Sequence, residues 1–477
     1  MRMAIYDIES SSAITSWSSI LEIGGILIDE HFKEIDRFNL RGRIPSYEIP
    51  QASALIVNKT SIDLLTKSNL SNYELVSQVE AIFKKWSPAL FLGWSNINFD
   101  CEMIRKSFFR NLRFPYITNA APNKRTDALN IARAAYAIDS SILNTELNEK
   151  GNVSMKLESL IRMQGYDTSK SHTAQFDAIA ACKILQLIHK KIQPELWSSF
   201  LRTANRSDTE TIAKKEQIIT LVEYFYGKSK FYLVAPLHPN FCIHPVYQYV
   251  QAIDLKTEIE PLLNMSINEL KAEMSKTPKF LRTIRSNKAP MLLEAKYGMK
   301  TDPYKSMDPN LIKHRAKLIR ENETFSKNIL TALREIAEEK EQSKTQETLF
   351  AEESIYEKFT SNKDTSLFSS WHSAPFKEKL RLLDKFDDPR LVSFGKKIIY
   401  EEAPEVLPPD MLRSIKLGIA KRILSENNEK WWTVGRSYAE IDTLRDKYSN
   451  QNDQEKLKFL DDLNEYVMSV QKKYENI

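Results

Sequence analysis

The first 190 residues combine short apolar runs with segments whose apolar positions recur at helical spacing. Runs at residues 3–8, 20–29 and 34–40 are short and apolar or β-branched, with a plausible turn at Asp29-Glu30-His31, and they predict three antiparallel strands. A further buried strand is expected at residues 89–93. Helical spacing predicts helices at residues 72–86, 100–112, 127–138, 155–164 and 175–191. Strands followed by strand and helices in alternation indicate an α/β domain whose sheet is covered by helices.

The pattern changes after about residue 195. Residues 229–260 are rich in Tyr, Phe, Val and Pro and predict a small β-rich unit, with helices at 266–275 and 308–342. Residues 338–348 are dense in Glu, Lys, Gln and Thr without an apolar face, which favours a linker. Residues 352–477 are almost continuously helical in pattern. Because 477 residues exceed what one hydrophobic core organises, two or three domains are expected.

Composition and charge narrow the class of protein only slightly. The net charge of +5 is compatible with a polyanionic partner but does not require one, since a small excess spread evenly is a solvated surface. The three cysteines are far apart and predict reduced thiols. No apolar run approaches the ~20 residues of a membrane helix, and the N-terminus does not resemble a signal peptide. A cytoplasmic protein is therefore expected.

Two carboxylates stand at the end of the first predicted strand. Residues two apart in a strand point to the same face, so Asp7 and Glu9 are expected to project together. Adjacent carboxylates repel and raise each other's pKa unless a cation neutralises them. A hard divalent cation is the ion that carboxylate oxygens bind best. Alone, such a triplet also arises by chance in any chain rich in acidic residues.

Two further polar motifs follow at element boundaries. The segment from Gly93 to Asp100 lies between a strand and a helix, where Asp100 could simply cap the helix. His172 precedes a helix whose first turn carries Asp177; separately, these are ordinary for a surface histidine and a first-turn acid. Together, ordered D-x-E, N-x-N-F-D and H-x4-D resemble the DEDDh 3′→5′ exonucleases, which have an RNase H-like fold with a mixed sheet.

This resemblance implies a catalytic set of Asp7, Glu9, Asp100, His172 and Asp177. Asp7, Glu9 and Asp177 would ligate the main metal ion, Asp100 would help to hold a second, and His172 would be the general base. The implied cofactor is a pair of Mg²⁺ ions, for which Mn²⁺ can substitute, and such a two-metal site clamps the scissile phosphate. An unperturbed histidine pKa near ~6.5 suits proton transfer at neutral pH.

The later segments extend the resemblance to the bacterial exonuclease I family. The stretches that carry it are Asn287–Leu292, Leu318–Asn322, and Leu407-Pro408-Pro409 ahead of a basic helix. The resemblance implies a DEDDh exonuclease domain over 1–195, an SH3-like α+β domain over 196–345 and a helical C-terminal domain over 346–477. It further implies a monomer that degrades single-stranded DNA from its 3′ end to nucleoside 5′-monophosphates, in DNA repair and recombination.

The same resemblance implies substrate contacts for Glu9, Lys156, Arg105 and Arg133. Lys156 stands where the family usually has arginine; lysine keeps the charge but not the bidentate fork. The two arginines could instead be solvated helix residues. Aromatic residues among basic ones at 224–232 could hold single strands by stacking, or could be core of the β-rich unit.

A partner follows from the resemblance as well. A basic helix could receive the acidic C-terminal tail of single-stranded DNA-binding protein, or could be a charged helix surface; its cationic residues are Lys313, His314, Arg315, Lys317 and Arg320. Two other functions stay open: a 3′→5′ exoribonuclease that trims RNA, and a clamp that binds single-stranded DNA without cleaving it. The two large domains after residue 200 favour the DNA exonuclease, and the presence of all five catalytic residues disfavours the clamp.

Overall fold

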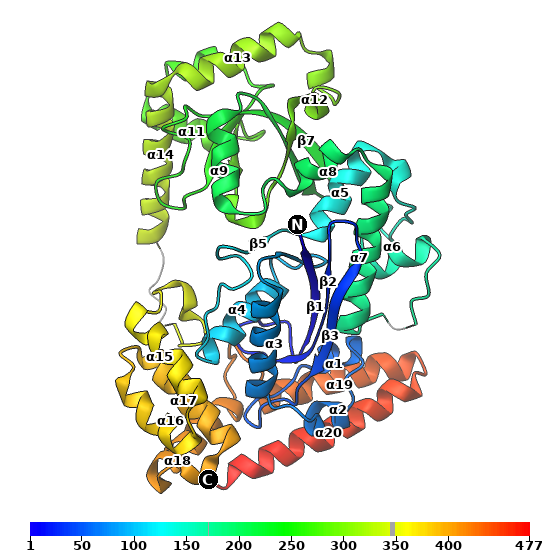
Figure 1. The fold of residues 1–477 in the computed structure, drawn as a ribbon, viewed down its shortest axis with the longest axis vertical. Coiled ribbons are helices and arrows are strands. Elements are labelled where there is room, and N and C mark those ends of the chain that lie inside the picture. Colours follow the sequence, from blue (N-terminus) through cyan, green and yellow to red (C-terminus); the bar gives the residue numbers. More distant parts are fainter. Residues whose placement is uncertain (170, 344–348) are drawn as a thin grey trace.

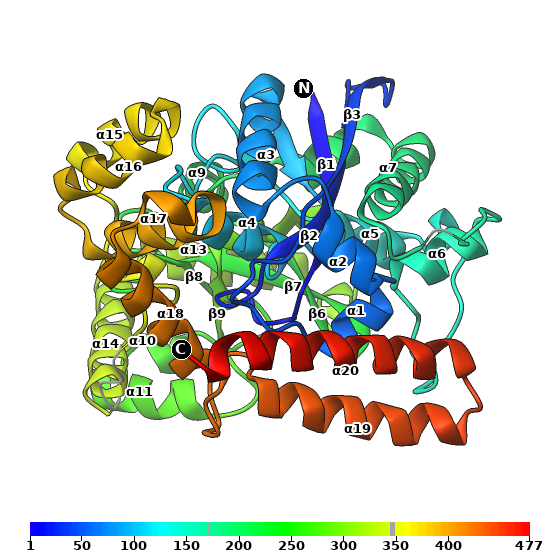
Figure 2. The same cartoon turned by 90° about the horizontal axis from the view of Figure 1, so that it is seen from below.

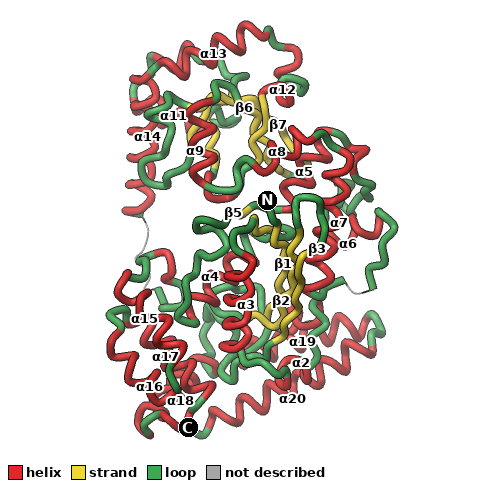
Figure 3. The backbone as a smooth tube through the Cα atoms, in the orientation of Figure 1, coloured by secondary structure: helices red, strands yellow, loops and turns green. Residues whose placement is uncertain are grey.

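The structure, a computed structural model, describes residues 1–169, 171–343 and 349–477. The chain forms three units that follow one another in sequence (Figure 1). The first unit, blue to teal, occupies the centre and right of that view, the second, green, lies above it, and the third, yellow to red, lies below and to the left. The two sheets of the molecule appear as separate yellow groups in Figure 3, one in each of the first two units.

The first unit is built on a mixed five-stranded sheet. Its central strand β1 pairs antiparallel with β2 and parallel with β4, and β2 pairs antiparallel with β3. This confirms the three predicted antiparallel strands and the expected RNase H-like arrangement. The strand order is β3-β2-β1-β4-β5, with β1 at Met3–Ser10, β2 at Ile20–Ile28, β3 at Glu34–Arg41, β4 at Leu90–Leu92 and β5 at Lys124–Arg125.

Helices cover both faces of this sheet, and successive residues of β1 point alternately toward them. Met3 and Ile5 pack in a core with α5 and α7, whereas Ala4, Tyr6 and Ile8 pack in another with α3 and α4. Odd-numbered residues of β1 therefore face α7. The helices are α1 Ala52–Val57, α2 Ile62–Lys67, α3 Asn72–Trp86, α4 Asp100–Arg110, α5 Ala128–Ile138, α6 Leu157–Met163 and α7 Ala174–Lys191.

The second unit confirms the predicted β-rich segment, although its first strand begins ten residues earlier than expected. It is an antiparallel five-stranded sheet in the order β10-β6-β7-β8-β9. The strands are β6 Ile219–Phe225, β7 Lys228–Pro236, β8 Val250–Asp254, β9 Leu281–Ile284 and β10 Met291–Glu294. The helices of this region are α8 Pro194–Leu201, α9 Arg206–Lys215, α10 Glu260–Leu263, α11 Ile267–Ser275, α12 Ala295–Gly298, α13 Pro309–Glu321 and α14 Glu323–Gln342.

Two expectations for the end of this unit need correction. The single helix expected at 308–342 is two helices, because the Asn322 side chain accepts from the Phe325 N–H and starts α14. The linker expected at 338–348 is helical as far as Gln342, since α14 packs on α11 and Lys271 pairs with Glu335 and Glu339. Residues 344–348 of that expected linker lie outside the described residues.

The third unit is helical, as predicted. Its last two helices run side by side beneath the first unit, as Figure 2 shows in the view from below. Glu440 of α19 accepts from the Ala52 N–H at the start of α1, where Gln51 provides no side-chain cap. The helices are α15 Asn362–Ser373, α16 Phe376–Leu382, α17 Pro389–Glu402, α18 Pro409–Ile423, α19 Val434–Asn450 and α20 Gln454–Glu475.

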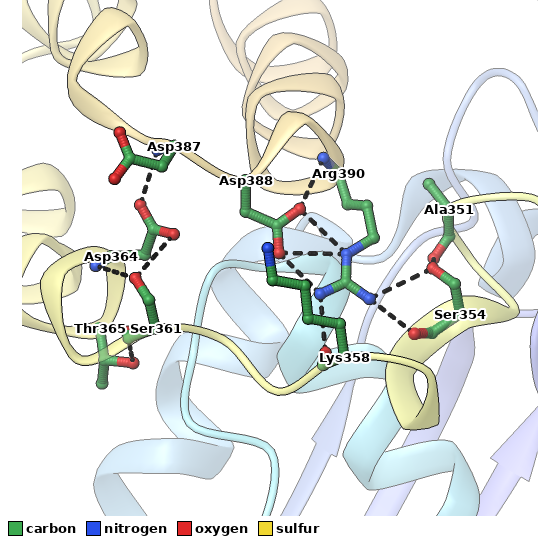
Figure 4. Close-up of polar contacts among 9 residues, drawn as sticks. All are labelled: Ala351, Ser354, Lys358, Ser361, Asp364, Thr365, Asp387, Asp388 and Arg390. Atoms are coloured by element: carbon green, nitrogen blue, oxygen red, sulfur yellow. Dashed lines mark hydrogen bonds and ion pairs between the residues drawn. The ribbon is translucent and has the colours of Figure 1, made fainter.

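Arg390 on α17 fixes the beginning of the third unit (Figure 4). Its guanidinium donates to the Ser354 and Lys358 carbonyls at 2.6 and 2.8 Å and pairs with Asp388. The same guanidinium lies 4.9 Å from the ring centroid of Phe109 on α4. One residue therefore ties the segment before α15 to α17 and to the first unit.

Two expectations about environment can be compared with the structure. Cys101, Cys182 and Cys242 are free thiols, as predicted; all three are buried, and the first two lie on α4 and α7. Over residues 1–169, 171–343 and 349–477, no helix has the length and apolar character needed to span a membrane.

Candidate active site

Three carboxylates meet where β1 ends against the start of α7. Asp7 and Glu9 lie on the face of β1 that α7 covers, and Asp177 lies in the first turn of α7. Within the described part of the chain, one group of candidate metal ligands stands out. Oxygen atoms of Asp7, Glu9 and Asp177 all lie within 4.8 Å of one another, and all three residues are partly exposed.

A glycine allows α7 to approach the sheet closely enough to form this group. Gly24 of β2 is paired with Asp7, and a Cβ atom placed on Gly24 would lie 2.3 Å from the backbone nitrogen of Gln175. Its other near neighbours, Gln175 Cα and the carbonyl carbon of Ala174, are also backbone of α7. The absence of a side chain at this one position therefore lets the first turn of α7 lie on the sheet beside Asp7.

Asp100 is the first residue of α4, but it does not cap that helix through its side chain. Its carboxylate accepts backbone hydrogen bonds from its own N–H and from Ile8, which links it to β1. The loop that leads to it is held by Asp127, whose carboxylate accepts from the N–H groups of Ser95 at 3.2 Å and Ile97 at 3.3 Å. Asp100 lies near enough to raise the pKa of Asp7, although it is outside the group of three.

His172 lies on the loop before α7, as expected, in a left-handed backbone conformation with φ of 66°. Its Nε2 is 3.5 Å from a carboxylate oxygen of Glu158, and its side chain is 41% exposed. Its main-chain N–H donates to Asp177. The backbone of His172 is thus bound to the carboxylate group, while its exposed imidazole lies beside Glu158.

The electrostatics of the group are unfavourable without a cation. Burial, together with the charges of Asp177, Glu22 and Asp100, raises the pKa of Glu9 to about 8. Burial likewise raises the pKa of Asp7, together with the charges of Asp100 and Asp177. The pKa of Asp177 rises to about 6, mainly through burial and despite the opposing effects of His172. Carboxylates that lie close together without a compensating positive charge have raised pKa values.

These residues fit a divalent cation. Carboxylate oxygen is the ligand type that hard cations such as Mg²⁺ prefer, and three such oxygens converge on one place. A further carboxylate, Glu22, pairs with Glu9 across the strands and is held by Arg41. Because Arg41 neutralises Glu22, the charges of Asp7, Glu9 and Asp177 remain for a cation to balance.

The raised pKa values predict a pH-dependent stability for the metal-free protein. A carboxyl group whose pKa is raised by folding favours the folded state below its unfolded pKa, and this contribution is lost as pH rises through the folded value. For Glu9 and Asp177 the loss falls between about pH 4 and pH 8. We expect a lower Tm at pH 8 than at pH 6 in EDTA, and a larger stabilisation by Mg²⁺ at pH 8. Thermal unfolding with and without Mg²⁺ measures both, and the control is Glu9→Gln, whose profile should be shallower because the Glu9 contribution is removed.

The residues expected to contact substrate differ in their surroundings. Lys156 is exposed and directly precedes α6. Arg105 is not a solvated helix arginine: it is 8% exposed and donates to Glu102, Asn119 and Tyr356. Arg133 stacks on Tyr224 of the second unit, with its guanidinium carbon 3.7 Å from the ring centroid.

The basic helix is only partly a charged surface. Lys313, His314 and Lys317 are exposed on α13. Arg315 and Arg320 are instead buried, and their guanidinium groups donate to backbone carbonyls, among them those of Leu255 and Ala213. Two of the five cationic residues therefore hold the second unit together, because backbone carbonyls of this unit accept hydrogen bonds from their guanidinium groups.

The sequence comparisons identify relatives of this chain. The family model of the exonuclease I C-terminal domain matches residues 349–470. Exodeoxyribonuclease I of Haemophilus influenzae is 27% identical over 313 residues, which cover 61% of this chain and 64% of that protein. Exodeoxyribonuclease I of Escherichia coli K12 is 26% identical over 261 residues, covering 52% and 54%. The chain thus spans just under two thirds of the first relative's length in alignment.

The structural comparisons extend over the whole chain. Escherichia coli exonuclease I in complex with a dA16 oligonucleotide has a TM-score of 0.81 at 19% identity, covering 98% of this chain and 99% of that one. Exonuclease I of Methylocaldum szegediense has a TM-score of 0.81 at 18% identity over the same shares. A complex described as ExoI with SSB-Ct has a TM-score of 0.79 at 19% identity, again covering 98% and 99%. At these identities the likeness establishes the fold.

Proposed function

Since the chain belongs to the bacterial exonuclease I family, we propose that it is a metal-dependent 3′→5′ exodeoxyribonuclease that hydrolyses single-stranded DNA to nucleoside 5′-monophosphates. The observation that carries the proposal is the meeting of Asp7, Glu9 and Asp177 at one end of the sheet, beside Asp100. A role in DNA repair and recombination and a cytoplasmic location remain predictions.

The carboxylates supply the place for two Mg²⁺ or Mn²⁺ ions. Asp7, Glu9 and Asp177 would hold one, and Asp100 would help to hold the second. When bound, such ions activate water and stabilise charge on the phosphate and the leaving oxygen. The protein's own contribution is to fix the oxygen ligands: β1 holds two through its ladder, and α7 holds the third against Gly24.

Two further residues act on the substrate in this proposal. His172 is the general base: its exposed imidazole takes the proton from the attacking water, and its backbone stays bound to Asp177. Glu158, 3.5 Å from Nε2, can orient the ring and stabilise its protonated form. Lys156 supplies a positive charge for a substrate phosphate from an exposed position just before α6.

A groove on the sheet of the second unit is consistent with a single-stranded substrate. Its lining combines aromatic and cationic residues, including Tyr224, Tyr247, Tyr249, Arg133, Arg282 and Lys288. Lys288 donates to Asn98 at 3.1 Å, which joins the lining of the groove to the loop that precedes Asp100. Stacking combined with phosphate neutralisation holds single strands irrespective of sequence. In this proposal Arg133 contributes its charge there, and Arg105 helps to shape the adjoining wall.

The acidic C-terminal tail of single-stranded DNA-binding protein is a proposed partner, because a similar structure is described as a complex of ExoI with SSB-Ct. The exposed cations Lys313, His314 and Lys317 on α13 are available to an acidic peptide. Arg315 and Arg320 are not part of this proposal, since the fold already uses them. The monomeric state expected from the family is retained.

Time courses on 5′-labelled substrates test the proposed function. Single-stranded DNA, matched RNA and blunt duplex DNA are each incubated with Mg²⁺ or EDTA. We expect rapid Mg²⁺-dependent shortening of the single-stranded DNA only. RNA degraded as fast or faster would assign the protein to RNA trimming, and binding without shortening would make it a clamp.

A further inference from the structure

The pairing of β1 with β2 becomes irregular directly after Glu9. The regular register of β1 with β2 shifts between Glu9 and Ser10, and residues 11–19, here called the Trp17 loop, connect the two strands. The loop is closed at its base, where the Ser11 N–H donates to the Ser19 carbonyl at 3.0 Å. Glu9 therefore lies next to a register shift, with only Ser10, paired with Ile20, between it and this loop, so its position depends on how the loop is held.

The base of the loop is bound by the first unit. The Glu48 carboxylate accepts from the hydroxyls of Ser11 and Ser19 and from the Ser19 N–H at 3.0 Å. Buried Asn58 donates from Nδ2 to the Ser10 carbonyl at 3.0 Å. These contacts leave little freedom at the two ends of the loop.

Helix α4 binds the middle of the loop. Lys106 Nζ donates to the hydroxyls of Thr15 and Ser16, each at 2.8 Å, and Arg110 donates to the carbonyls of Ser16 and Ser18. Because α4 begins at Asp100, the loop after one site carboxylate is bound to the helix that carries another. The geometry of the site and the geometry of this loop are thus set together.

The tip of the loop inserts into the third unit. The Trp17 ring centroid lies 4.8 Å from that of Trp431 and 5.4 Å from that of Phe350, which are themselves 5.1 Å apart. The guanidinium of Arg422 lies 4.7 Å from the Trp17 centroid and 5.2 Å from the Trp431 centroid. The three rings and the guanidinium therefore pack against one another where the first and third units meet.

Further hydrogen bonds fix the positions of Arg422 and Trp431 in this cluster. Arg422 donates to Glu352 at 2.8 Å, and Lys397 of α17 donates to the same carboxylate at 2.5 Å. Glu352 is 5% exposed. Trp431 Nε1 donates to the Arg422 carbonyl at 2.9 Å, which fixes the indole. A loop tip held by such a set cannot shift without breaking several buried contacts.

We infer that Trp17 is a positioning residue through which the C-terminal helical unit sets the place of the Glu9 carboxylate in the cation site. This inference rests on the proposed function, because it assigns a role at the same site. In this role the third unit completes the structure around a metal ligand. Contacts behind metal ligands of this kind typically change metal affinity by about 10–100-fold when they are removed.

Binding of Mn²⁺, followed by electron paramagnetic resonance, tests the inference apart from turnover. We expect Trp17→Ala to bind Mn²⁺ about tenfold more weakly than wild type. Its kcat on single-stranded DNA should fall while KM stays unchanged, because the loop tip does not touch the substrate groove. Trp17→Phe keeps an aromatic ring in the cluster and should restore both quantities to near the wild-type values.

Two further variants make the outcome decisive. Arg422→Gln removes the cation from between the indoles without altering the first unit, and it should weaken Mn²⁺ binding in the same direction even if Trp17→Ala fails to fold. His372→Asn weakens another contact between the same two units, to Tyr73 and Arg113, and should leave Mn²⁺ binding unchanged. If His372→Asn weakens it equally, or if Trp17→Ala and Arg422→Gln bind like wild type, the inference is wrong. A wild-type protein that neither binds Mn²⁺ nor cleaves would instead overturn the proposed function.

Discussion

Replacing Asp177 by asparagine is expected to lower kcat on single-stranded DNA by roughly 10³-fold or more while leaving DNA binding largely intact. Asp177 is the one member of the carboxylate group supplied by α7, and the amide lacks the charge that a cation requires. An amide oxygen can still accept from the His172 N–H, so the loop before α7 should keep its conformation. Single-turnover cleavage and a filter-binding assay in EDTA measure the two effects.

The same substitution is expected to stabilise the metal-free protein. The charge of Asp177 raises the pKa values of Asp7 and Glu9, so its removal relieves repulsion that amounts to about 1 kcal/mol at pH 8. Asp139→Asn, which alters an exposed carboxylate in the same unit, should show neither effect. Near-normal turnover in Asp177→Asn would contradict the assignment of Asp177 as a ligand, and a lower Tm in EDTA would contradict the electrostatic account.

Replacing Gly24 by alanine is expected to lower kcat by about 100-fold although no chemical group of the site is changed. The added Cβ would meet three backbone atoms of α7 at 2.3 to 2.7 Å, so the helix must move on the order of 1 Å to reach ordinary contact. A displacement of that size at a catalytic constellation can cost about 10²-fold in rate. Overpacking of this kind also destabilises by about 1–3 kcal/mol.

The matched control for Gly24→Ala is Gly418→Ala. Gly418 lies in α18, and a Cβ there would have no neighbour within 4 Å, so activity should not change and the helix should gain up to about 1 kcal/mol. Metal titration separates the two variants further, since Gly24→Ala should need more Mg²⁺ for half-maximal activity. If Gly24→Ala retains wild-type kcat and Mg²⁺ dependence, the close approach of α7 is not what forms the site.

Most individual elements were predictable because their patterns are local. The run at residues 3–8 is apolar on both faces of β1, and the spacing at 175–191 places one face of α7 on the sheet. Where prediction was wrong, a tertiary contact was responsible. Residues 338–342 have no apolar face of their own, yet they are helical because α14 continues along α11.

The candidate site residues were predicted from order and spacing, whereas the residues that support them were not. Asp7 and Glu9 are two apart in one strand, which is a local fact. Glu22 faces Glu9 only because β2 pairs with β1 in one register. Asp127, at the start of α5, accepts hydrogen bonds from the backbone at residues 95–97. The sequence indicated only that it stands at the start of a predicted helix. A charged helix surface was one interpretation of the segment that contains Arg315. Its guanidinium is instead buried and donates to carbonyls some 60 residues away in the chain.

The sequence by itself determined most types of element and marked Asp7, Glu9 and Asp177 as candidate metal ligands, because these follow from periodicity and motif spacing. Only the tertiary structure decided which distant groups meet. It brought α7 onto Gly24, directed the buried arginines inward and placed Trp17 against Phe350 and Trp431. The physical reason is that side-chain burial and pairing depend on contacts between residues far apart in the chain, and local patterns carry no information about such partners.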